Sequence, residues 1–205
     1  QEQRQWETAV AHYEKALAIY VEFNDRYSQA STYHQLGRVA QEQRQWETAV
    51  AHYEKALALK IEFNDRYSQA STYHQLGIVA QAQRQWETAV AHYEKALAIY
   101  VEFNDKHGQA RLYHGFGRVA EEQERWNEAR DYFFKALEIF HAFNDSYATD
   151  ITIRSLARVW QASQTPSASH LSESIATRLA ALLHISPVEA AAQLNQLAGG
   201  TSDSS

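Results

Sequence analysis

The stretch QEQRQWETAVAHYEKALA at residues 1–18 decides the fold, because it recurs unchanged at residues 41–58. It recurs once more at residues 81–98, where Ala82 replaces a glutamate. The repeat period is therefore 40 residues, and block 121–160 keeps the same frame with more substitutions. Near-identical copies are typical of a duplicated structural unit, so we expect one architecture throughout the repeats and not a separate chemistry in each.

Each unit contains two amphipathic helical patterns separated by Asn24-Asp25, a dipeptide that recurs every 40 residues. Asparagine tolerates the left-handed conformation that ends a helix, and aspartate is a good N-cap for the next one. The second pattern runs from Tyr27 to Ala40. A single helix pair cannot bury its apolar faces, so we predict that the pairs stack. The first pattern has apolar residues at three- and four-residue spacing, namely Trp6, Ala9, Val10, Tyr13, Ala16, Leu17 and Tyr20.

Small and aromatic residues stand in a fixed order within each copy. In the first complete copy they are Tyr33, Leu36, Gly37, Ala40, Trp46, Ala49, Tyr53 and Ala56. This order resembles the tetratricopeptide repeat (TPR), although Arg44 stands where that family usually has a loop glycine and the closing proline is absent. The resemblance covers residues 1–163 and implies an all-α fold, a right-handed α-solenoid (TPR superhelix) of stacked antiparallel helix pairs. Forty-residue repeats with this turn further resemble the C-terminal TPR arrays of bacterial STAND-type signalling proteins and spindle-orientation scaffolds.

The pattern changes towards the C-terminus. We expect the repeat array at residues 1–163, with its first repeat truncated, and a linker at 164–169 because Pro166 and several serines interrupt the periodicity. Residues 170–198 are predicted to form a C-terminal helical cap, a helix pair that covers the last repeat. Residues 199–205 are expected to be a flexible tail.

Composition excludes several classes of function. With 25 acidic against 19 basic residues, the net charge of -6 argues against nucleic-acid binding. No apolar run is long enough for a bilayer, so we expect no membrane association and a cytoplasmic location. The chain has no cysteine and no methionine, which predicts no disulfide framework and suggests a piece of a longer protein.

No arrangement of residues indicates catalysis, so we expect no enzyme activity, no metal site and no cofactor. Six of the ten histidines recur by duplication, namely His12, His52 and His92, and His34, His74 and His114. Equivalent residues of stacked repeats lie about 8–10 Å apart, which is too far to share one ion. No phosphate-binding loop or nucleophile elbow is present.

The resemblance implies a concave groove lined by the first helix of each pair. Helical spacing supports a polar stripe there, offset from the apolar one. Four arginines gather towards its C-terminal half, and arginine forks suit carboxylates, so an acidic peptide segment or a peptide C-terminus is the expected ligand. The groove residues are Ser31, His34, Arg38, Gln41 and Glu42, then Ser71, His74, Ile78, Gln81 and Ala82, then Arg111, His114, Arg118, Glu121 and Glu122, and finally Ile151, Arg154, Arg158, Gln161 and Ala162.

Three functions are compatible with this pattern. The first is a non-catalytic protein–protein interaction module that binds a peptide or protein segment in the groove. The second is the ligand-sensing arm of a larger STAND-type NTPase. The third is a structural spacer or self-assembling scaffold, since near-identical repeats can stack end to end between chains and form homo-oligomers.

Overall fold

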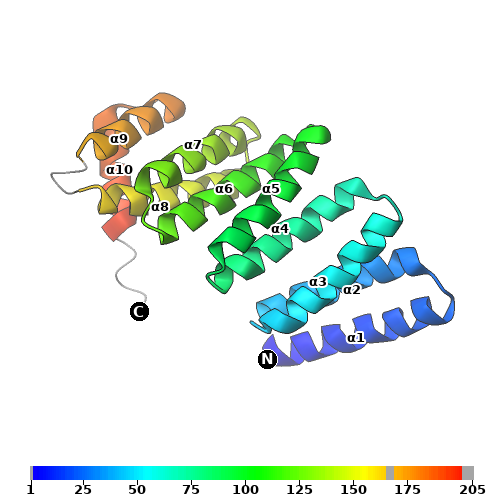
Figure 1. The fold of residues 1–205 in the computed structure, drawn as a ribbon. Helices are drawn as coiled ribbons and strands as arrows, with labels where there is room; N and C mark the ends of the chain where they lie inside the picture. The colour runs from blue at the N-terminus through cyan, green and yellow to red at the C-terminus, as the bar shows by residue number, and fades with distance from the viewer. Residues whose placement is uncertain (1, 165–168, 200–205) are drawn as a thin grey trace. The chain divides into compact units, whose positions relative to one another are not determined.

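The computed structural model describes residues 2–164 and 169–199, all the regular structure of which is helical. The chain divides into two compact units, Gln1–Asn104 and Asp105–Ser205, here called the N-terminal and C-terminal units. In order, the helices are α1 (Glu2–Glu22), α2 (Arg26–Glu42), α3 (Trp46–Glu62), α4 (Arg66–Ala82), α5 (Trp86–Glu102), α6 (Lys106–Glu122), α7 (Trp126–Ala142), α8 (Ser146–Ala162), α9 (Ser169–Leu183) and α10 (Pro187–Gly199). Figure 1 shows the helices of each unit packed side by side, in sequence order from α1 to α5 and from α6 to α8.

The turns between helices form as the sequence predicts. Asn24 has φ 53° and so ends α1 in the left-handed region, and the same is true of its copies. Asp25 then caps α2, with its carboxylate accepting from the backbone N–H of Ser28. At the other turns the left-handed residue is Arg44, Arg84 or Glu124, where glycine would carry no steric penalty.

A glycine and an aromatic ring fix the contact within each helix pair. Tyr53 of α3 is 0% exposed and its ring lies against Gly37 of α2. A Cβ added at Gly37 would lie 2.6 Å from the Tyr53 Cδ1 atom. The pairs α4–α5 and α6–α7 repeat this contact, with Phe133 as the ring in the last pair. The mid-helix glycines are therefore required for the close approach of the two helices.

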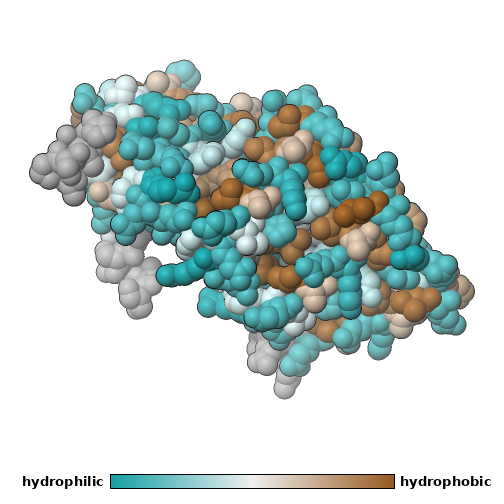
Figure 2. All heavy atoms as spheres, viewed as in Figure 1, coloured by the Kyte–Doolittle hydropathy of each residue, from teal (hydrophilic) through white to brown (hydrophobic). Residues whose placement is uncertain are grey.

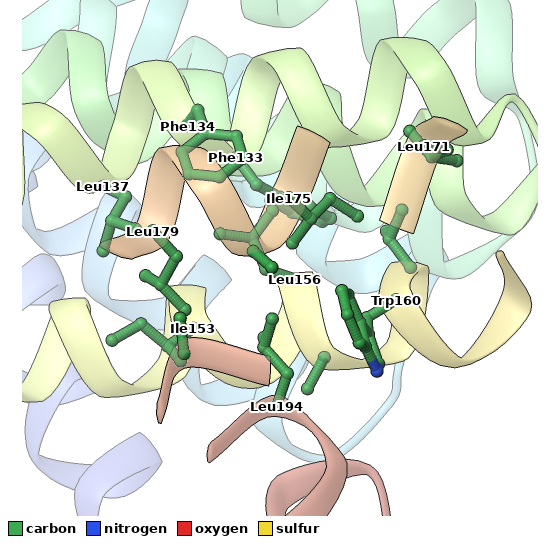
Figure 3. Packing of buried hydrophobic residues seen from close by; sticks show 14 of the residues in the cluster. Phe133, Phe134, Leu137, Ile153, Leu156, Trp160, Leu171, Ile175, Leu179 and Leu194 are labelled. Carbon is green, nitrogen blue, oxygen red and sulfur yellow. The ribbon is translucent and has the colours of Figure 1, made fainter. Parts of the chain in front are cut away.

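The C-terminal helices continue the core of the last pair. In Figure 3, Ile175 and Leu179 of α9 and Leu194 of α10 point into the same apolar cluster as Phe133 and Leu156. In the repeats, the first helix of each pair packs against the helix that follows it in sequence. α8 departs from this pattern, because α10 packs along it whereas α9 has few contacts with it. The sequence did not predict this exchange of partners.

The expected segment boundaries can be placed only in part. α9 begins at Ser169, one residue inside the expected linker, and α10 ends at Gly199, the first residue of the expected tail. The rest of the tail, 200–205, and linker residues 165–168 lie outside the described residues.

Candidate binding site

A pocket lies between α6 and α8 of the C-terminal unit and has a volume of about 420 Å³. Seven of its lining residues are among those that the sequence places in the groove, and the eighth, Ser155, was missed. The first helices of the third and fourth units thus bring their polar stripes together. The lining residues are His114, Arg118, Glu121, Glu122, Ile151, Arg154, Ser155 and Arg158.

Two of the three pocket arginines already have carboxylate partners. Arg158 forms a two-pronged ion pair with Glu121, in which Nη2 donates to Oε2 at 3.0 Å and Nε donates to Oε1. Arg118 donates to Glu122 one turn along α6, at 3.4 Å. Arg154 is exposed and has no ion-pair partner among the described residues. The pocket therefore carries three positive and two negative charges, and the excess charge is at Arg154.

His114 lines this pocket as a neutral group. Its Nε2 lies 3.3 Å from Ser155 Oγ, which links α6 to α8. Burial, together with the charges of Arg118 and Arg158, lowers the pKa of His114 to about 4. At neutral pH the ring therefore adds no charge and serves as a hydrogen-bonding group.

The N-terminal unit has different polar contacts at the equivalent positions. There Tyr53 donates its hydroxyl hydrogen to Gln41 Oε1 at 2.9 Å, and Tyr93 does the same to Gln81. In the C-terminal unit Phe133 has no hydroxyl, and the glutamine is replaced by Glu121, which pairs with Arg158 instead. The tyrosine hydroxyl is thus absent in the repeat that has the Glu121–Arg158 ion pair, and the two differences set this unit apart from the other.

The remaining predicted groove residues lie on the first helices as expected but are not equally accessible. Gln81 is only 7% exposed, so its side chain does not face solvent. His34 is half-buried and its Nδ1 lies 3.2 Å from Thr72 Oγ1 of α4, while burial lowers its pKa to about 4. The exposed members outside the pocket are Ser31, Arg38, Glu42, Ala82, Arg111 and Gln161, and the half-buried ones are Gln41, Ser71, His74, Ile78 and Ala162.

Lys60 is a buried charge that the sequence analysis did not single out as a site residue. Its Nζ donates to Thr72 Oγ1 at 2.8 Å and to the Ser68 carbonyl at 3.1 Å, and the residue is 7% exposed. Burial lowers the pKa of Lys60 to about 8. Lys60 stands at the position that holds a tyrosine, Tyr20 or Tyr100, in two other copies of the repeat. This difference is the signal in the sequence that could have identified Lys60.

The described residues hold no group of three or more metal-binding side chains. Within the same ranges, no helix combines the length and the apolar character that a membrane span requires. The site therefore rests on the charges and hydrogen-bonding groups of α6 and α8.

A sequence profile of the tetratricopeptide repeat family matches residues 1–62 and 68–142. No curated protein sequence matches the chain. Among solved structures, the apo form of RapI has a TM-score of 0.74 at 17% identity, covering 98% of this chain and 67% of RapI. BtubC (BKLC) from P. vanneervenii has a TM-score of 0.68 at 17% identity, covering 98% of this chain and 88% of that one.

A kinesin light chain-type protein from Podosopora anserina, with nearly identical TPR-like repeats, has a TM-score of 0.66 at 19% identity. The match covers 99% of this chain and 92% of that one. At such low identity these likenesses show the fold alone, an all-α solenoid of helical repeats.

Proposed function

Because the chain belongs to the tetratricopeptide repeat family, we propose that it is a non-catalytic interaction module that binds an acidic peptide segment in the pocket between α6 and α8. The observation that carries this proposal is the guanidinium of Arg154, which lines the pocket, is exposed and has no ion-pair partner within residues 2–164 and 169–199. A guanidinium presents a rigid fork of donors that fits a carboxylate.

The pocket favours a small number of acidic groups over a long acidic tract. Arg118 forms an ion pair with Glu122, and Arg158 forms one with Glu121. A ligand carboxylate would therefore compete with a glutamate for each of these two arginines but not for Arg154. Both glutamates would repel additional carboxylates. A peptide with one aspartate or glutamate, or with a free C-terminal carboxylate, matches the single excess positive charge of the pocket. Ile151 also lines the pocket and offers an apolar contact to such a peptide.

A peptide-display selection tests the proposal. Random 12-residue peptides with free C-termini are selected against the chain, and the recovered peptides are measured by fluorescence anisotropy. We expect an essential carboxylate in each peptide, and a loss of about tenfold in affinity with Arg154→Gln, the range for a hydrogen bond to a charged group. Arg125→Gln, which removes an exposed charge of the same unit outside the pocket, is the matched control and should bind normally.

Neutral selected peptides, or equal binding to Arg154→Gln, would contradict the proposal. Failure to select any peptide would favour the spacer function instead. The sensing-arm function stays a prediction, and it would require the selected peptide to alter nucleotide hydrolysis by an attached domain.

A further inference from the structure

Pairs of exposed aromatic rings recur along one edge of the N-terminal unit, where helices end and begin. Tyr27 at the start of α2 meets Phe63 at the end of α3 in an edge-to-face contact, with ring centroids 5.7 Å apart. Tyr67 of α4 and Phe103 at the end of α5 repeat this contact at 5.4 Å. The four side chains are 44–56% exposed. These four residues are called the aromatic edge.

The exposure of these rings is a property of the repeat. Tyr67 lies in α4, which packs against α3 and α5, yet it is nearly as exposed as Tyr27. Phe63 follows α3, which packs against α2 and α4, and it is exposed as well. The α1–α2 and α3–α4 turns lie at the same end of the helices (Figure 1), and Figure 2 shows apolar atoms at the surface near them. Exposed apolar surface of this kind is typical of an interaction site.

Acidic residues outnumber basic ones around the aromatic edge, five to two. Both arginines are already in exposed ion pairs, Arg26 with Glu62 at 2.8 Å and Arg66 with Glu102 at 2.9 Å. The excess of carboxylates repels phosphates and acidic groups and favours a positively charged ligand. The acidic residues are Glu22, Asp25, Glu62, Asp65 and Glu102.

Other tyrosines of the unit have a cation near the ring that the rings of the aromatic edge lack. Lys55 Nζ lies 5.3 Å from the ring centroid of Tyr33, and the next repeat has the same contact. Within the part of the chain that the structure describes, no cation lies over the rings of Tyr27, Phe63 or Phe103. These three rings therefore offer a cation site that no side chain of the described residues fills.

We propose that the aromatic edge binds an arginine-bearing basic segment of a partner protein. A guanidinium can stack on an aromatic ring while its remaining N–H groups donate to a neighbouring carboxylate. Asp65 is close enough to do this at the first ring pair, because its Oδ2 accepts a hydrogen bond from the Tyr27 hydroxyl at 3.4 Å. At the second pair, Glu102 directly precedes Phe103. Two ring pairs one repeat apart suit a segment with two or more arginines.

The equivalent positions of the C-terminal unit have different chemistry. His107 stands in place of the tyrosine, and its Nε2 lies 2.9 Å from Asp145 Oδ2. Ala142 replaces the glutamate that directly precedes Phe63 and Phe103 in the N-terminal unit. The proposed site is therefore confined to the N-terminal unit, and it does not depend on the pocket between α6 and α8.

The probe is a fluorescent peptide with four arginines, GRGGRGGRGGRG with blocked ends. Its matched control carries citrulline, a neutral residue of nearly the same shape, in place of each arginine. We expect saturable binding of the arginine peptide by anisotropy, and binding at least about tenfold weaker for the citrulline peptide. The variant Phe63→Ser plus Phe103→Ser should bind the arginine peptide about tenfold more weakly, because each exposed ring contributes about two- to fivefold. The comparison of the two peptides uses the unmodified chain, so it does not depend on the folding of this variant.

Two glutamine variants separate the edge from general charge attraction. Glu62→Gln plus Glu102→Gln should weaken binding of the arginine peptide. Glu54→Gln plus Glu94→Gln removes the same charge from exposed positions of α3 and α5 and should bind normally. Arg154→Gln should also bind normally, which separates the edge from the proposed acidic-peptide pocket.

Equal binding of the two peptides, unchanged binding by the double serine variant, or equal losses in the two glutamine variants would each overturn the proposal. So would a dimer of the unmodified chain, seen by sedimentation, that the double serine variant abolishes, because a second copy of the chain would then cover the edge.

Discussion

Replacing Lys60 by phenylalanine should change how the stability of the protein depends on pH. Lys60 is 7% exposed and its pKa is about 8 in the folded chain, against an ordinary value of 10.5. Phenylalanine is the matched replacement, because Phe140 of α7 occupies the position equivalent to Lys60 of α3 and is 3% exposed. The variant therefore removes the charge without leaving a cavity.

The lowered pKa fixes the sign of the effect. Below pH 8 Lys60 is protonated in both the folded and the unfolded chain, so its contribution to the free energy of unfolding does not change with pH. Between pH 8 and 10.5 the unfolded chain retains a proton that the folded chain has lost, so the free energy of unfolding rises with pH. A difference of 2.5 pH units, from 8 to 10.5, amounts to about 3 kcal/mol. This gain is lost again as the pH falls through 8.

Urea unfolding followed by circular dichroism at several pH values from 7 to 10.5 measures the effect. We expect Lys60→Phe to have a larger free energy of unfolding than the unmodified chain at pH 7. The difference between the two free energies should become smaller by about 3 kcal/mol between pH 7 and pH 10.5. Taking the difference between the two proteins cancels the titration of the tyrosines they share. The exposed Lys15→Gln is the control, and its gap should not change with pH. A constant gap for Lys60→Phe would refute the reasoning, because it would mean that the ammonium group is as well solvated in the folded chain as in the unfolded one.

Three further variants test the helix contacts and the pocket. Gly37→Ala should lower the free energy of unfolding by about 1 kcal/mol, because the cost of overpacking against the Tyr53 ring exceeds the gain of about 1 kcal/mol in helix propensity. A variant that is more stable in urea unfolding would contradict this. Arg84→Gly, at φ 58°, should stabilise by about 0.5–1 kcal/mol, whereas Gln83→Gly, at φ -86°, should destabilise, and equal effects of the two would disprove the left-handed strain. Glu121→Gln frees Arg158 and should strengthen acidic-peptide binding about threefold or more in anisotropy, so weaker binding would show that Glu121 instead holds Arg158 in place for the ligand.

Much of the fold follows from local patterns. The 40-residue period and the apolar spacing predict the helix pairs, and the Asn-Asp turns are confirmed by the left-handed Asn24 and the capping Asp25. The contact of each mid-helix glycine with an aromatic ring, such as Gly37 with Tyr53, was not predicted and comes from the structure. The end of the chain was harder, because which of α9 and α10 packs along α8 depends on the shape of the remaining apolar surface and not on periodicity.

The candidate site was predictable in its position but not in its electrostatics. Helical spacing puts Arg154 and Arg158 on one face of a helix, and the resemblance to the tetratricopeptide repeat puts Arg118 on the same groove. Arg158 and Glu121 are 37 residues apart in sequence, and their pairing depends on the register between α6 and α8, which spacing within one helix does not determine. Within the part of the chain that the structure describes, Arg154 is the one pocket arginine that lacks an ion pair. This too depends on the register between helices, so the sequence did not predict it.

Side-chain NMR of the arginines can show whether an acidic peptide binds at Arg154. The Nε–Hε signal of Arg154 is assigned by comparison with Arg154→Gln, and a selected peptide is then titrated into the labelled chain. We expect a saturable shift of the Arg154 signal, with the Arg125 signal unchanged. Saturating peptide binding that leaves the Arg154 signal in place would show that the peptide binds elsewhere.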